Sequence, residues 1–205
     1  EDDFLVLGDV NLRAGGDLFW DLSEYEGLSA GTLQLSSVSG QVRFDEFGAS
    51  NFDVEGLDVS STQNLNLSGL TINLPGALDL TSGRAVVLNG TTLSSGSLMV
   101  TAGLQVNAVN ADLNAVGAMK LDAGGQINLD GASVDAGGFT ADSNTSIRAD
   151  GAEIDVDGAA NLFADTFMLL DDLQASGSRF EAQAGSNIAG DGVGVSTLGA
   201  IEVSA

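Results

Sequence analysis

Short runs of alternating apolar and polar residues recur along this chain at a fixed period. Residues 118–138 show the pattern most clearly. They contain three apolar pairs, each spaced by two residues: Met119/Leu121, Ile127/Leu129 and Val134/Ala136. A pair of this kind, bounded by Gly, Asn or Asp, is typical of a short β-strand with one buried face. The segment therefore predicts three short strands separated by turns.

The same three-strand template fits most of the sequence. Between residues 56 and 158 it repeats in five successive units of 20 or 21 residues. Residues 1–55 fit with small insertions, and residues 159–205 fit less regularly, with an open C-terminal end. We therefore expect a single repeat domain over residues 1–205, with irregular coils at 1–55, regular coils at 56–158 and less regular coils at 159–205.

A repeating unit of three strands and three turns can close one triangular coil. Each strand then pairs in parallel with its counterpart one coil away, about 4.8 Å along the axis. The predicted fold class is all-β, a right-handed parallel β-helix (β-solenoid) of about nine triangular coils and roughly 45 Å in length. Equivalent inward residues should stack as a ladder, such as Leu57/Leu78/Leu98/Met119/Phe139. An antiparallel sandwich or barrel is the alternative, and the constant phase of the repeat disfavours it.

Glycine marks the expected corners of the coil. In the clearest unit the three corners fall at Gly124–Gly125, Gly131 and Gly137–Gly138. Tight turns often require positive φ, which Gly adopts without steric cost. The single proline, Pro75, also lies at a predicted corner, where it removes no ladder hydrogen bond.

The repeats resemble those of filamentous haemagglutinin-type adhesins and related exoproteins of two-partner secretion. The segments Asp9-Val-Asn-Leu-Arg-Ala-Gly-Gly16, Ala118-Met-Lys-Leu-Asp-Ala-Gly-Gly125 and residues 129–138 carry the likeness, which is best over 9–16 and 77–158. The resemblance implies a long right-handed β-helical shaft at the extracellular surface of a Gram-negative bacterium. The Asn-Pro-Asn signature of the secretion module is not present, so the chain resembles shaft.

Composition narrows the possible functions. The 205 residues include no Cys, no His and one Pro, with a formal net charge of −23. These counts exclude zinc fingers, disulfide scaffolds and Ser-His-Asp triads. The charge argues against nucleic-acid binding, and no apolar run is long enough for a membrane span. A hydrophobic content of 43% with only 17% charged residues indicates a folded, β-rich chain.

Catalysis is not expected, although some β-helices degrade polysaccharides. Such enzymes need a carboxylate cluster, usually with a basic residue beside it. The best carboxylate set is Asp130, Asp150 and Asp172, which could lie along one corner in consecutive coils. The six basic residues fall at different repeat positions and cannot form one column. Solvated corner residues are the simpler interpretation.

Calcium is the one cofactor that the sequence raises. Carboxylates stacked along a solenoid repel one another unless a cation or water intervenes. The candidate ligands are Asp155, Asp157, Asp171 and Asp172. The nonapeptide of calcium-binding β-rolls and the EF-hand loop are both absent, so we expect no cofactor, with calcium as the weaker alternative.

Both ends of the sequence fall within a coil. Leu5-Val6-Leu7 reads as the last strand of an incomplete coil, and Ile201 and Val203 begin a new one. No capping helix is visible, so we expect either a piece of a longer shaft or copies stacked head to tail as a homopolymer. The expected function is a secreted structural fibre or adhesin shaft. The alternatives are a carbohydrate-binding or polysaccharide-degrading β-helix with a host or cell-surface glycan as partner, and a trimeric phage-type fibre.

Overall fold

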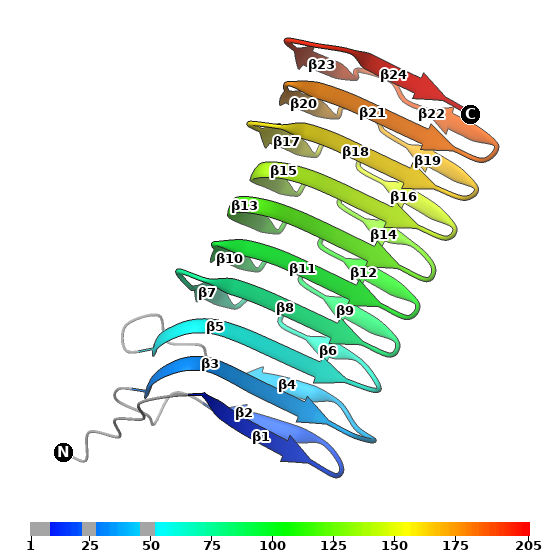
Figure 1. The fold of residues 1–205 in the computed structure, drawn as a ribbon. Coiled ribbons are helices and arrows are strands. Elements are labelled where there is room, and N and C mark those ends of the chain that lie inside the picture. The colour runs from blue at the N-terminus through cyan, green and yellow to red at the C-terminus, as the bar shows by residue number, and fades with distance from the viewer. Residues whose placement is uncertain (1–8, 22–27, 46–51) are drawn as a thin grey trace.

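A computed structural model describes residues 9–21, 28–45 and 52–205, and over these ranges the chain forms β-strands and turns without a helix. The strands stack in parallel as a β-solenoid of about eight turns (Figure 1). This confirms the predicted fold class. The smaller sheet has nine strands, one from each coil, in agreement with the prediction of about nine coils. Nine strands are separated by eight steps of one coil each, which gives about eight full turns.

Each coil has three faces. The first face contains β1 (Val10–Ala14), the later parts of β3 (Leu28–Ser37), β5 (Phe52–Ser61), β13 (Asp112–Ala123) and β15 (Ser133–Ser143), and β8 (Ala77–Ser82), β11 (Ser97–Ala102), β18 (Ala159–Ala164), β21 (Arg179–Ala184) and β24 (Ile201–Ser204). The second contains β2 (Leu18–Asp21), β4 (Val42–Asp45), β6 (Leu65–Asn66), β9 (Ala85–Val87), β12 (Gln105–Asn107), β14 (Ile127–Asn128), β16 (Ser146–Arg148), β19 (Phe167–Leu169) and β22 (Asn187–Ala189). The third contains the earlier parts of β3, β5, β13 and β15, with β7 (Thr71–Asn73), β10 (Thr92–Ser95), β17 (Glu153–Val156), β20 (Gln174–Gly177) and β23 (Gly194–Thr197).

The core is a set of apolar ladders that run along the axis. Leu57 pairs with Leu78, which pairs with Leu98, then with Met119 and Phe139, as the repeat predicted. All five side chains are at most 1% exposed. Because side chains alternate across a strand, the residues between them point outward, and the period-two pattern of the sequence becomes an inside and an outside.

The corner between the third and first faces, called here the third corner, follows the prediction in some coils and differs from it in others. Separate strands flank it at β10 and β11, at β17 and β18 and at β20 and β21, as the template predicted, but β3, β5, β13 and β15 each run through it without a break. A register shift between Ala115 and Ala118 takes up the bend. A β-bulge allows a strand to turn while its hydrogen-bonded ladder continues on both sides. The first and third faces therefore merge into one 15-stranded sheet.

The corner between the second and third faces, the second corner, is a β-turn with one residue at positive φ. In the described residues this conformation occurs only in this column, which contains Gly69, Gly90, Asn110, Gly131, Gly151, Asp172 and Gly192, with φ between 50° and 73°. The requirement favours Gly, and Asn and Asp tolerate it. The glycine prediction is confirmed here for Gly131.

At the other two corners glycine serves a different purpose. Gly124 lies at the first corner, between the first and second faces, and Gly137 lies at the third, and neither has positive φ. A Cβ atom on Gly124 would overlap the carbonyl oxygen of Gly103, and one on Gly137 would lie 2.8 Å from the carbonyl oxygen of Val116. Here the chain needs room for the preceding coil, so the predicted role of positive φ was wrong at these corners.

Candidate functional site

Four aspartates form a column along the second corner: Asp130, Asp150, Asp171 and Asp191. The turns of successive coils bring them into line, as the N–H of Gly131 donates to Asp150 O and that of Gly151 to Asp171 O. Of the predicted carboxylate set, Asp130 and Asp150 belong to this column. Asp172 does not, because it occupies the next position of the turn, at φ 50°.

The carboxylates of this column connect neighbouring coils. The backbone N–H of Asp150 donates to Asp130 Oδ1 at 3.1 Å, and that of Asp191 donates to Asp171 Oδ1 at 3.0 Å. Arg148 on β16 reaches the same corner, with Nε 2.6 Å from Asp130 Oδ2 and Nη2 3.3 Å from Asp150 Oδ2. The hydrogen bond and the charge of Asp130 raise the pKa of Arg148. These contacts give the column a structural role, since carboxylates that accept backbone N–H bonds fix the turn.

The four calcium candidates fall into two pairs, which lie toward opposite ends of the third face. Asp155 is an outward residue of β17, Asp157 follows it at the third corner, and Asp171 and Asp172 lie at the second corner. The Asp155 carboxylate accepts the hydroxyl of Ser176. Within residues 9–21, 28–45 and 52–205, no three acidic side chains come together as a metal site would require. Calcium binding stays a prediction, without a built cluster to support it in this part of the chain.

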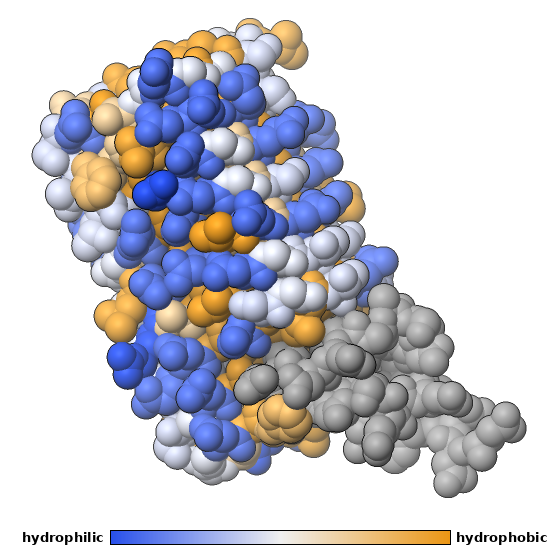
Figure 2. Space-filling model, turned by 180° about the vertical axis from the view of Figure 1, so that it is seen from behind, coloured by the Kyte–Doolittle hydropathy of each residue, from blue (hydrophilic) through white to orange (hydrophobic). Residues whose placement is uncertain are grey.

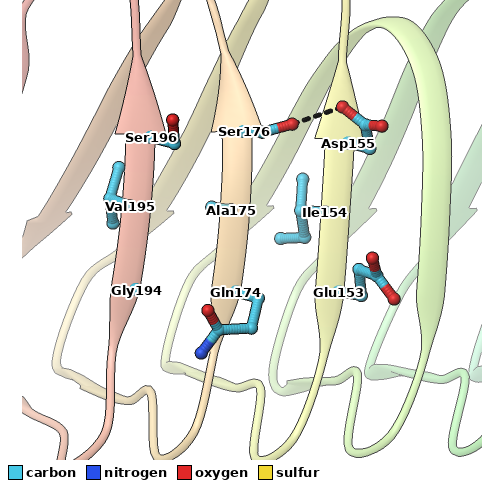
Figure 3. A pocket seen from close by; sticks show the side chains of 9 residues that line it. All are labelled: Glu153, Ile154, Asp155, Gln174, Ala175, Ser176, Gly194, Val195 and Ser196. Carbon is cyan, nitrogen blue, oxygen red and sulfur yellow. Dashed lines mark hydrogen bonds between the residues drawn. The ribbon is translucent and has the colours of Figure 1, made fainter.

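A hollow of about 350 Å³ lies on the outside of the third face, across β17, β20 and β23. Figure 3 shows one row of outward side chains, Glu153 and Gln174, and a second row, Asp155, Ser176 and Ser196, on either side of it. Gly194 has no side chain in the first row, and the Gln174 side chain lies over it, with Nε2 donating to Gly192 O at 3.2 Å. Two carboxylates, an amide and hydroxyls are groups that can hydrogen-bond a polyhydroxylated ligand. No aromatic side chain is among the lining residues.

A smaller hollow, about 100 Å³, lies on the first face near the N-terminal coils. Gln34, Ser36, Asp58 and Ser60 contribute to its lining, and Asn11 Nδ2 donates to Gln34 Oε1 at 2.8 Å. Partial burial, together with the neighbouring charge of Asp79, raises the pKa of Asp58. Asp58 and Asp79 are ladder partners, so their carboxylates face the same side one coil apart. This pair was not among the predicted site residues, although Asp58 and Asp79 occupy equal positions in the repeat.

The last coil leaves core-type residues uncovered. Ile201 and Val203 of β24 pair with Phe180 and Ala182, which are 2% and 0% exposed. Ile201 and Val203 themselves are 53% and 59% exposed, and Leu198 before them is 99% exposed. Figure 2 shows hydrophobic colour at this end of the rod and mainly hydrophilic colour on the flank below it. The other predicted assembly residues, Leu5, Val6 and Leu7, lie outside the described residues.

Comparison with models of known protein families, with curated proteins and with solved structures found no match to this chain. In the described ranges, the structure contains no helix of the length and apolar character that crosses a bilayer.

Proposed function

We propose that this chain is a structural rod, a segment of an extracellular fibre or adhesin shaft at the surface of a bacterium. Its neighbours along the axis are further coils, contributed by a second copy of the chain or by the continuation of a longer one. The exposed inward-type residues of β24 carry the proposal, because Ile201 and Val203 occupy the positions that every inner coil buries.

A further coil would satisfy this end in two ways. It would hydrogen-bond the outer edge of β24, and it would bury the exposed half of Ile201 and of Val203, a gain of about 1.5–3 kcal/mol for the two together. A contact between the end of one copy and the start of the next is heterologous, so it repeats as an open filament. The net charge of −23 opposes side-by-side association of such rods.

The surface location rests on the resemblance of the repeats to filamentous haemagglutinin-type shafts. The proposal assigns the rod no catalytic reaction and no cofactor. Adhesion would then reside in other parts of the assembly, and the rod would set their distance from the cell.

Electron microscopy and sedimentation of the purified chain test end-to-end stacking. Wild-type protein should form rods whose length rises with concentration, in steps of about nine coils at about 4.8 Å per coil. Ile201→Asp and Val203→Asp should abolish lengthening, because a charge would enter the stacked core. Ser204→Asp is the matched control, since Ser204 pairs with Gln183 in an outward column and should leave lengthening intact. Uniform short rods at all concentrations would show that copies do not stack, and rods associated in threes, side by side, would instead favour a phage-type fibre.

The hollow on the third face favours a second candidate function, binding of a neutral glycan. Its lining offers carboxylates, an amide and hydroxyls, which can hydrogen-bond the hydroxyl groups of a sugar. Calorimetric titration with neutral oligosaccharides should then show binding that Gln174→Ala removes. Asn114→Ala, an outward change on the same face in β13, serves as the control. Equal affinity of both variants for the oligosaccharide would place any binding outside the hollow. Release of new reducing ends from the oligosaccharide would indicate a polysaccharide-degrading enzyme.

A further inference from the structure

The second corner repeats a chemically labile dipeptide. An Asn or Asp followed by Gly occurs there at Asn89–Gly90, Asp130–Gly131, Asp150–Gly151 and Asp191–Gly192. In such dipeptides the backbone nitrogen of Gly can attack the side-chain Cγ of the preceding residue, because Gly offers no steric barrier. The four sites share one turn type. They differ in the coil that lies above each of them and in the ion pairs that Arg148 makes with Asp130 and Asp150.

In the three inner coils the attacking nitrogen is already engaged. The N–H of Gly90 donates to Val109 O at 2.9 Å, that of Gly131 to Asp150 O at 2.8 Å, and that of Gly151 to Asp171 O at 2.8 Å. Each acceptor belongs to the next coil. The side chains of Asn89 and Asp130 are also held, since their Oδ1 atoms accept the N–H groups of Val109 and Asp150. Attack at these sites requires the following coil to open.

In the last described coil, the backbone nitrogen of Gly192 contacts the carboxylate of the preceding residue, Asp191. The N–H of Gly192 donates to Asp191 Oδ1 at 3.0 Å, and both residues are exposed. The backbone of Asp191 stays fixed, because its N–H donates to Asp171 Oδ1 at 3.0 Å and its carbonyl accepts the N–H of Asp172 at 2.7 Å. The nucleophile and the carboxyl group are therefore in contact, on a held turn that none of the described coils covers.

We propose that Asp191–Gly192 is a site of spontaneous aspartate isomerisation, which a stacked coil suppresses. Gly192 N attacks Cγ of the protonated Asp191 carboxyl group. The amide proton and the carboxyl hydroxyl leave as water, and a five-membered succinimide forms. Water then adds to one of the two ring carbonyls. Opening at the main-chain carbonyl gives an isoaspartyl linkage through Cγ, and opening at Cγ restores aspartate. The net change is a rearrangement that needs no oxidant, cofactor or enzyme.

Tryptic digestion tests this with internal controls. Cleavage after Arg84, Lys120, Arg148 and Arg179 places the four sites in four separate peptides, and Asp191 is the only aspartate in residues 180–205. The folded chain is aged at mildly acidic and neutral pH and then digested. Isoaspartate is measured in each peptide by isoaspartyl methyltransferase labelling and by fragment-ion mass spectrometry, which also separates Asp150 from Asp157. The isolated peptides, aged in parallel, give the intrinsic rate of each dipeptide.

Relative to these intrinsic rates, we expect Asp191 to isomerise about tenfold or more faster than Asp130 and Asp150, which corresponds to about 1.4 kcal/mol less opening free energy at the uncovered coil. Equal normalised rates at Asp130, Asp150 and Asp191, or the fastest normalised rate at Asn89, would overturn the proposal. Asp191→Glu should remove the signal from residues 180–205, because a six-membered ring forms much more slowly. A signal that persists in this variant would place the reaction at another residue.

Suppression by a stacked coil rests on the proposed function and is tested separately. If copies stack, the rate at Asp191 should fall as protein concentration rises, and Ile201→Asp should remove this dependence. A rate at Asp191 that is high but independent of concentration would refute suppression by stacking of copies. It would leave the assignment of the labile site intact.

Discussion

Two neighbouring residues of β11 offer a direct test of which side chains face inward. Val100 is 0% exposed and pairs with Leu80 and Leu121, whereas Met99 is 48% exposed and pairs with Asp79 and Lys120. We predict that Val100→Asp destabilises the protein strongly and that Met99→Asp leaves it nearly unchanged. Both variants add the same charge to the same strand, so only the face differs.

The magnitude follows from burial. Removing the Val100 side chain from the core forfeits about 1.5–3 kcal/mol of apolar burial. Placing an unpartnered carboxyl group there costs a further 1–3 kcal/mol or so even when it is protonated. The sum, roughly 3–6 kcal/mol, is a large part of the 5–15 kcal/mol that stabilises an ordinary domain. Met99→Asp exchanges one exposed side chain for another between a negative and a positive neighbour, so we expect a change within about 0.5 kcal/mol.

Urea unfolding followed by circular dichroism measures the difference. With a slope of about 2 kcal/mol per molar urea, the Val100→Asp midpoint should fall by roughly 2 M. Hydrogen exchange should show the loss in β8 and β13, because each coil contacts its neighbours directly. If Val100→Asp does not fold, Val100→Ala and Met99→Ala carry the same contrast, at about 1–3 kcal/mol against near zero. A urea midpoint for Val100→Asp equal to that of the wild type would refute the inward assignment of Val100. Loss of structure in Met99→Asp would refute the outward assignment of Met99.

Three further predictions follow from the corners and the charge. Gly131→Ala should lower the free energy of unfolding by about 1–2 kcal/mol, because φ is +64° there and a Cβ would overlap Asn110 Oδ1, whereas Asn110→Gly should be nearly neutral in the same urea assay. The pKa of Asp58 is raised in the folded state, so the folded chain binds this proton more tightly than the unfolded chain. Stability from this group is therefore greatest in acid and is lost as pH rises through the folded pKa. Asp58→Asn should thus raise the urea midpoint at neutral pH and lose its advantage at acid pH, and an equal advantage at both would contradict the assignment. Stability should also rise with salt because the net charge is −23, with Mg²⁺ and Ca²⁺ acting equally at matched ionic strength; an effect limited to Ca²⁺ would instead support the calcium prediction.

The inward ladders could be predicted from the sequence because alternation is a local property. Leu98 and Val100 must share a face of any strand that contains them both, and the period of the repeat then places Met119 and Leu121 beside them. The second corner was equally accessible, since positive φ restricts the residue type at Gly131 itself. Each of these features is decided within one unit of the repeat.

Features that depend on neighbouring coils could not be predicted in the same way. The role of Gly124 depends on how closely the carbonyl of Gly103 approaches, which no pattern within one unit reveals. The hollow on the third face depends on how the side chains of β17, β20 and β23 lie beside one another across three coils. Asp191 and Asp150 precede Gly in the same turn, but Asp150 lies under a following coil and beside Arg148, whereas the Gly192 N–H contacts the Asp191 carboxylate.

The uniform spacing of the contacts between coils has a consequence for how the rod forms. The backbone N–H that donates to the Asp130 carboxylate belongs to Asp150, 20 positions later. The Ser61 hydroxyl donates to the carbonyl oxygen of Gly40, 21 positions earlier. Sequence separation between contacting residues sets much of the entropic cost of folding, and here it stays at one coil however many coils the rod contains. Adding coils therefore lowers the relative contact order. Each new coil can fold on the one before it as soon as its own 20 or so residues are available, so the length of the rod can change by whole units without slowing the step that builds it.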